Sequence, residues 1–180
     1  QFLQDHNIGM SHAGSILKTY GSQAMTVLET DPFLMARQIP GLGFKTMDGL
    51  AQSLGVEKTD PLRLCSCLIC RLTDLEQEGH VYGDRDGLLN SCARMAGVLA
   101  HDLEPALTLL AEEEEIQVID AGNGQGQEGP MGEKGEVRVY LARLYRAEFG
   151  IASRIRALIS MPARTLSLSG EEILEQVLAS

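Results

Sequence analysis

The stretch from Pro40 to Thr46 has the residue types and spacing of an anion-binding turn. Pro40 ends the preceding helix by pushing the residue before it toward extended geometry. Gly41 and Gly43 allow backbone angles that a side chain would forbid, so the chain reverses within a few residues. A helix that resumes near Lys45 leaves its first N–H groups without intrahelical acceptors at a positive helix end, where anions bind. The sequence therefore predicts an anion site, with a backbone phosphate as the anion we expect. Its amides belong to Gly43, Phe44, Lys45 and Thr46.

The same stretch resembles a helix-hairpin-helix motif. That motif has an apolar residue, Gly, an apolar residue, Gly, three variable residues and then Ala, and residues 39–46 fit it. Met47 stands where the family prefers Ala, and a larger side chain there would widen the packing between the two helices. The alternative interpretation is an interhelical turn that binds no ligand.

An earlier copy of this pattern supports the functional interpretation. Residues 9–21 align with residues 43–55 at a constant offset of 34 positions, and both segments begin and end on glycine. Self-similarity at a fixed offset is typical of duplicated supersecondary units. The resemblance then implies tandem hairpins that hold a nucleic-acid backbone at successive phosphates. Asn7 stands in the first copy where Gly41 stands in the second, so the first copy fits less well. Its candidate contacts are Gly9, Ser11 and His12.

The charge distribution limits how strongly such hairpins bind DNA. The chain of 180 residues has a formal net charge of −10, whereas phosphate contacts need positive charge. Residues 1–60 carry four Lys or Arg against six Asp or Glu, and residues 61–121 carry four against twelve. Because hairpins rely on backbone N–H donors, the mildly acidic first segment lowers affinity without excluding binding. We expect weak, salt-sensitive contact.

The remaining elements predict a mainly α fold. Helices are expected over residues 22–29, 61–78, 84–96, 100–115 and 141–159, with a short extended segment at 79–82. Residues 116–119 and 137–140 read as two strands joined by the glycine-rich stretch 121–135. Three helices followed by a β-hairpin are the order of a winged-helix-like unit. The predicted organisation is a tandem helix-hairpin-helix domain (1–59), a winged-helix-like domain (60–140), and a linking C-terminal helix and tail (141–180).

In a winged-helix domain the third helix usually enters a groove of DNA. The composition of the corresponding helix here, residues 100–115, opposes that role. The four glutamates 112–115 have the wrong sign for a phosphate contact, which favours a scaffold or docking use or a solvated helix end. The glycine-rich stretch 121–135 lacks a G-K-[ST] ending and a following helix, so a flexible hairpin tip is favoured over a nucleotide loop.

The best basic patch is a candidate DNA or domain contact, although solvated arginines opposite a buried stripe are common. It consists of Arg143, Arg146 and Arg154.

The cysteines and histidines give no catalytic or metal centre. Cys65 and Cys67 lie two positions apart in a predicted helix and point to nearly opposite sides, and only Cys67 and Cys70 share a face. We therefore interpret the cysteines as buried reduced thiols rather than zinc or iron–sulfur ligands. Near His6 and His12 no nucleophile and base pair stands out. We predict no catalytic residue, no metal and no cofactor in this chain.

Taken together, the order of motifs resembles the N-terminal region of RecD-like DNA helicases of the longer type. The resemblance covers most of residues 1–160. Its more specific parts are Gly43-Phe44-Lys45-Thr46 and Leu144-Tyr145-Arg146-Ala147-Glu148; Asp31-Pro32-Phe33 and Glu78-Gly79-His80-Val81-Tyr82 also fit. It implies an ATP- and Mg-dependent motor that moves 5′ to 3′ on single-stranded DNA and follows this region. That motor's phosphate loop is expected beyond Ser180, so this fragment would not hydrolyse ATP.

The leading hypothesis is therefore a non-catalytic accessory module that grips DNA without sequence preference, in DNA repair or recombination. The expected partners are DNA, the protein's own motor domain and other repair proteins. No apolar run predicts a membrane span or an export signal, and we expect a cytoplasmic protein. One alternative is a protein-interaction or spacer module of the same helicase that does not contact DNA. Another is the hairpin region of a repair nuclease or glycosylase, with catalytic residues outside this fragment.

Overall fold

The computed structural model describes residues 9–39, 41–120, 137–161 and 178. The chain forms two compact units, Gln1–Tyr145 and Arg146–Ser180, and each is described by itself. None of the described helices is long and apolar enough to cross a membrane.

Short helices make up the first part of Gln1–Tyr145. They are α2 (Met10–Tyr20), the 3-10 turn η1 (Gly21–Gln23), α3 (Ala24–Thr30), α4 (Pro32–Gln38) and α5 (Phe44–Ser53). Asp31 begins α4, because one carboxylate oxygen accepts the N–H groups of Phe33 at 3.0 Å and Leu34 at 3.1 Å. Pro32 occupies the first helical position, where its missing N–H costs nothing.

Longer helices follow in the same unit. They are α6 (Pro61–Gln77), α7 (Arg85–Ala96), the 3-10 turn η2 (Ala100–Leu103) and α8 (Glu104–Glu112). Asp60 caps α6 by accepting the Arg63 N–H at 3.0 Å. Gly97 ends α7 in the left-handed region, with φ 66°. A further helix, α9 (Ala142–Ser160), begins in Gln1–Tyr145 and continues into Arg146–Ser180.

A three-stranded antiparallel sheet completes Gln1–Tyr145. Its order is β1 (Gly83–Asp84), β3 (Val137–Leu141) and β2 (Ile116–Asp120), and β2 pairs with β3 from Ile116↔Leu141 to Asp120↔Val137. The two predicted strands are confirmed. The expectation of extended chain at 79–82 is wrong by a few residues: β1 has two residues and pairs with β3, so tertiary pairing, not local propensity, places it. The glycine-rich stretch 121–135 lies outside the described residues.

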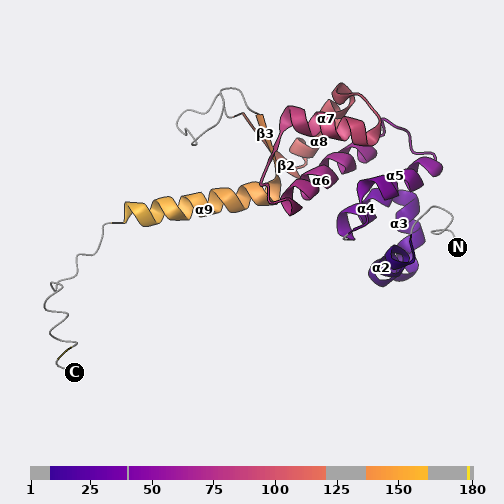
Figure 1. The fold of residues 1–180 in the computed structure, drawn as a ribbon, viewed down its shortest axis with the longest axis horizontal. Helices are drawn as coiled ribbons and strands as arrows, with labels where there is room; N and C mark the ends of the chain where they lie inside the picture. Colours follow the sequence, from indigo (N-terminus) through magenta and orange to yellow (C-terminus); the bar gives the residue numbers. More distant parts are fainter. Residues whose placement is uncertain (1–8, 40, 121–136, 162–177, 179–180) are drawn as a thin grey trace. The chain divides into compact units, whose positions relative to one another are not determined.

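Helix α6 lies at the centre of the core. It packs against α4 and α5 and also against α7 and α8 (Figure 1). Buried apolar residues form one cluster that runs from Ile16 in α2 to Leu141 in β3. Within it, the Phe33 and Phe44 rings stack with centroids 5.7 Å apart. The mainly α fold with helix-hairpin-helix units and a winged-helix-like part is confirmed. The domain boundary at 59/60 stays a prediction.

Candidate nucleic-acid interface

The turn at Gly41 places the start of α5 at the surface. Across the turn the Leu42 N–H donates to the Ile39 carbonyl at 3.1 Å. Gly41 has φ +81°, a conformation that L side chains rarely adopt. Gly43 is the extended residue before α5, with φ −69° and ψ 165°. Gly41, Gly43 and Lys45 are exposed, while the Leu42 and Phe44 side chains are buried beneath them. The two buried side chains therefore attach the turn to the core, and its glycines remain accessible to solvent.

Three amides at this helix start have no acceptor in the part of the chain that the structure describes. They belong to Gly43, Phe44 and Lys45. The fourth predicted amide is different. The Thr46 N–H donates to the Gly43 carbonyl at 3.1 Å, so the expectation that it is free is wrong. The first turn tightens and satisfies that donor internally. Three donors remain at a positive helix end, which is what an anion requires.

The first copy repeats this geometry. Gly9 precedes α2 with φ −60° and ψ 154°, close to the angles of Gly43. Gly21 and Gly55, which follow α2 and α5, both have positive φ. Ile16 and its counterpart Leu50 are fully buried. The 34-residue offset therefore relates equivalent parts of two hairpin units. Asn7 and the Ser11 side chain lie outside what the structure describes.

His12 of the first copy lies next to the turn of the second copy. Its Nε2 lies 3.6 Å from the point where a Cβ on Gly41 would stand. A candidate contact of the first copy thus lies directly beside the turn of the second. The imidazole of the first copy therefore lies beside the turn that leads into the three amides.

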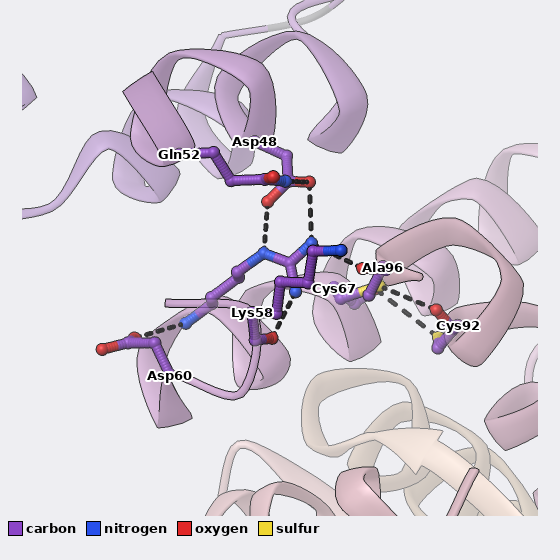
Figure 2. Close-up of polar contacts among 8 residues, drawn as sticks. Asp48, Gln52, Lys58, Asp60, Cys67, Cys92 and Ala96 are labelled. Carbon is purple, nitrogen blue, oxygen red and sulfur yellow. Dashed lines mark hydrogen bonds and ion pairs between the residues drawn. The ribbon is translucent and has the colours of Figure 1, made fainter. Parts of the chain in front are cut away.

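Sequence reasoning missed the ion pair that holds α5 in place. Arg63 of α6 is fully buried, and its guanidinium binds the Asp48 carboxylate of α5 through Nε–Oδ1 at 2.5 Å and NH2–Oδ2 at 2.8 Å (Figure 2). It also donates to the Ala96 carbonyl at 2.7 Å and to the Lys58 carbonyl. Gln52 donates to the second Asp48 oxygen at 2.7 Å. Among the described residues no buried side-chain nitrogen or oxygen atom lacks a hydrogen-bond partner.

This network fixes the helix that carries the candidate site. Asp48 lies one turn after Phe44, and the Arg63 guanidinium carbon lies 5.9 Å from the centroid of the Phe44 ring. The sequence contained a signal for it. Asp48 falls on the buried face of α5 with Phe44, Met47 and Ala51, and Arg63 adjoins the buried Leu64 in α6. A charge on each of two apolar faces indicates a buried ion pair.

The predicted basic patch does not form one free cationic surface. Arg143 binds both carboxylate oxygens of Glu76 in α6, and hydrogen bonding to Arg143 lowers the pKa of that carboxyl. Its charge is therefore already paired. Arg146 and Arg154 lie in Arg146–Ser180. Whether they contact DNA stays a prediction.

The cysteines lie in the core, as predicted. Cys65, Cys67, Cys70 and Cys92 are all buried and free. Burial raises the pKa of Cys65 and of Cys70 to about 11, and a hydrogen bond with Cys92 raises the pKa of Cys67. Among the described residues no group of three His, Cys, Asp or Glu is placed to hold a metal ion.

The comparisons with known proteins agree with this geometry. Residues 1–82 match the family model of the ATP-dependent RecD2 DNA helicase HHH domain. The chain is also 30% identical over 166 residues to the ATP-dependent RecD2 DNA helicase of Deinococcus radiodurans. That alignment covers 89% of this chain and 22% of the relative, so the chain spans less than a quarter of that protein.

Proposed function

We propose that the hairpins of this chain bind the DNA backbone for a RecD2-type helicase, because residues 1–82 match the family model of the RecD2 helix-hairpin-helix domain. In this proposal the chain is an accessory region of a helicase of that type. Its proposed role is non-catalytic and independent of base sequence. Amide donors at a helix start contact phosphate oxygens, which carry no base information.

One observation carries this proposal. The N–H groups of Gly43, Phe44 and Lys45 have no acceptor among the described residues, and they stand at the exposed start of a ten-residue helix. A phosphate that approaches there replaces water on three donors without displacing a protein group. The open space around Gly43, where an added Cβ meets nothing within 4 Å, permits that approach.

The acidity of the chain is compatible with this role. The donors are neutral amides, and the nearby side chains are Lys45 and His12, so few condensed counterions are released on binding. We expect a slope of log affinity against log salt of about −1 to −2. The resulting contact is weak alone and positions DNA for a stronger binding element.

Fluorescence anisotropy of labelled short DNA with the whole 180-residue chain tests the proposal. Single strands and duplexes are titrated at two salt concentrations with three proteins: the wild type, Gly43→Glu and Gly49→Glu. Gly49 is a matched control, because it lies in α5, the helix that Gly43 precedes, is exposed like Gly43 and also has open space around it. Gly43→Glu places a carboxylate in the anion site.

The expected result is binding that weakens with salt, is lost in Gly43→Glu and persists in Gly49→Glu. Equal loss in both variants would indicate a general charge effect and contradict a hairpin site. No binding at low salt would favour the second candidate, a protein-interaction or spacer module. The twelve acidic residues against four basic ones in 61–121 motivate that candidate.

We further propose that the longer protein has an ATP- and Mg-dependent motor that moves 5′ to 3′ on single-stranded DNA and contacts this region. The named activity of the Deinococcus radiodurans relative supports the motor. A DNA-stimulated ATPase assay on the longer protein, with and without this region, tests it. Unwinding with a 5′ overhang only would support the direction of movement.

A further inference from the structure

A cavity of about 590 Å³ lies in the winged-helix-like part, away from the hairpin residues in sequence. It is bounded by α6, the segment 79–84 and α7. The polar groups in its wall come from Arg71, His80, Tyr82, Asp84, Ser91 and Arg94. All of these residues lie in the described part of the chain. Its volume falls within the range of small-molecule pockets.

The cavity gathers positive charge in the most acidic part of the chain. Residues 61–121 contain four arginines against twelve Asp or Glu, and two of those four line the cavity. Outside the cavity, Arg63 and Arg85 are paired with carboxylates. Arg71 pairs with Glu78 at 3.0 Å.

Arg94 is exposed, and its guanidinium forms no ion pair or hydrogen bond with any other residue that the structure describes. This arginine therefore offers a guanidinium to an anion that enters the cavity. Arg71 of α6 lines the same cavity. Its hydrogen bond to Glu78 uses NH1 alone, whereas Arg143 is bound through both NH1 and NH2, so Arg71 keeps donors for an anion.

An aromatic ring is held in the same wall. Tyr82 is half-buried, and its ring packs against the Arg138 guanidinium at 4.7 Å and the Tyr140 ring at 5.3 Å. These contacts restrict the Tyr82 ring. His80, two residues earlier, is exposed at the same cavity. Guanidinium groups beside aromatic rings are the combination that holds phosphate and base of unpaired nucleotides.

We propose that this cavity binds one unpaired nucleotide unit, with the phosphate on Arg94 and Arg71 and the base against Tyr82. Asp84 favours a ligand that carries an amino donor as well as a phosphate. Its carboxylate caps α7 by accepting the Gly87 N–H at 2.7 Å and repels anionic groups, so the phosphate has to lie at the arginines and away from Asp84. The same carboxylate accepts an exocyclic amino group of a base such as cytosine. The proposal concerns a different site from the hairpins and does not depend on them.

The experiment uses ¹H–¹⁵N NMR of the whole chain with three probes: deoxycytidine monophosphate, deoxycytidine and a twelve-residue oligodeoxycytidine. The monophosphate should shift amides in residues 79–87. Deoxycytidine should bind at least about tenfold more weakly, because it lacks the phosphate that both Arg94 and Arg71 contact. Tighter binding of the oligomer identifies a DNA strand as the source of the nucleotide. Tighter binding of the monophosphate identifies a free nucleotide.

Two variants separate this site from general charge effects. Arg94→Gln should weaken monophosphate binding about tenfold. The matched control is Arg156→Gln, an exposed arginine of α9 that does not line the cavity, and it should leave binding unchanged. Gly43→Glu should also leave the monophosphate shifts unchanged, so failure of the hairpin site and failure of this site are distinguishable. Equal weakening by both arginine variants, tighter binding of hexaglutamate, or no shift at millimolar monophosphate would overturn the proposal.

Discussion

Replacing Arg63 by methionine tests whether the buried ion pair holds α5 against α6 and α7. Methionine keeps much of the side-chain length and removes the charge and all donors. Asp48, a residue that is 7% exposed, then keeps one side-chain hydrogen bond among the described residues, from Gln52. The carbonyls of Lys58 and Ala96 lose their guanidinium donor as well. Ala96 is the last residue of α7, where a carbonyl has no intrahelical partner.

The cost follows from these losses. Removing one partner of a buried ion pair costs about 3–5 kcal/mol, because a charge is left buried without its partner. The loss for Arg63→Met should lie at the upper end of this range, since the two carbonyls also lose their hydrogen-bond donor. Asp48→Asn should lie at the lower end, because Arg63 keeps both carbonyls. A loss of this size is a large fraction of the total stability of about 5–15 kcal/mol that domains have.

Urea unfolding followed by circular dichroism at pH 7 with a reductant measures the free energy of unfolding. The matched control is Arg71→Met, which removes a pair whose side chains are 23% and 52% exposed. Exposed pairs contribute about 0–1 kcal/mol, so this variant should remain close to the wild type. The double variant Arg63→Met, Asp48→Leu removes both charges and should cost far less than the two single losses together. If Arg63→Met and Arg71→Met change stability equally, the reasoning is refuted.

Three further outcomes are expected. Asp31→Ala should lower the free energy of unfolding by about 1 kcal/mol, because two N–H groups lose their cap; an unchanged thermal midpoint would contradict this. The pKa of Cys65 and of Cys70 is raised from 9.0 to about 11, so the folded state disfavours both thiolates. The free energy of unfolding should therefore fall as the pH rises from about 9 toward 11, because the thiols of the unfolded chain ionise first. Urea titrations at several pH values measure this dependence. If Cys65→Ala leaves the dependence of the free energy of unfolding on pH unchanged, the explanation is wrong. Arg143→Gln should raise the pKa of Glu76 toward its ordinary value, and an NMR pH titration that finds no change would disprove the pairing.

Most of the fold was predictable because local chemistry marks where its helices begin and end. Asp31-Pro32 starts α4, Asp60 starts α6 and Gly97 ends α7, and each signal acts within a few residues. The strand β1 was not predictable in this way. It has two residues and exists because β3, more than fifty residues later, pairs with it.

The candidate site was predictable in part for the same reason. The glycine spacing specifies a sharp turn and an uncapped helix start, and both are present at Gly41 and Gly43. The internal satisfaction of the Thr46 amide depends on how the first turn of α5 tightens, which composition does not encode. The nearness of His12 to Gly41 and the pairing of Arg143 with Glu76 depend on packing between distant segments. Sequence patterns cannot supply such contacts.

The most direct test of the central claim is a ¹H–¹⁵N NMR titration of the whole chain with a short duplex at low salt. The account predicts that the amide protons of Gly43, Phe44 and Lys45 shift downfield and saturate together, because each gains a phosphate acceptor. The Thr46 amide, already bonded to Gly43, should move less. If DNA binds while those three amides stay unshifted, the hairpin is not the point of contact and the account is contradicted.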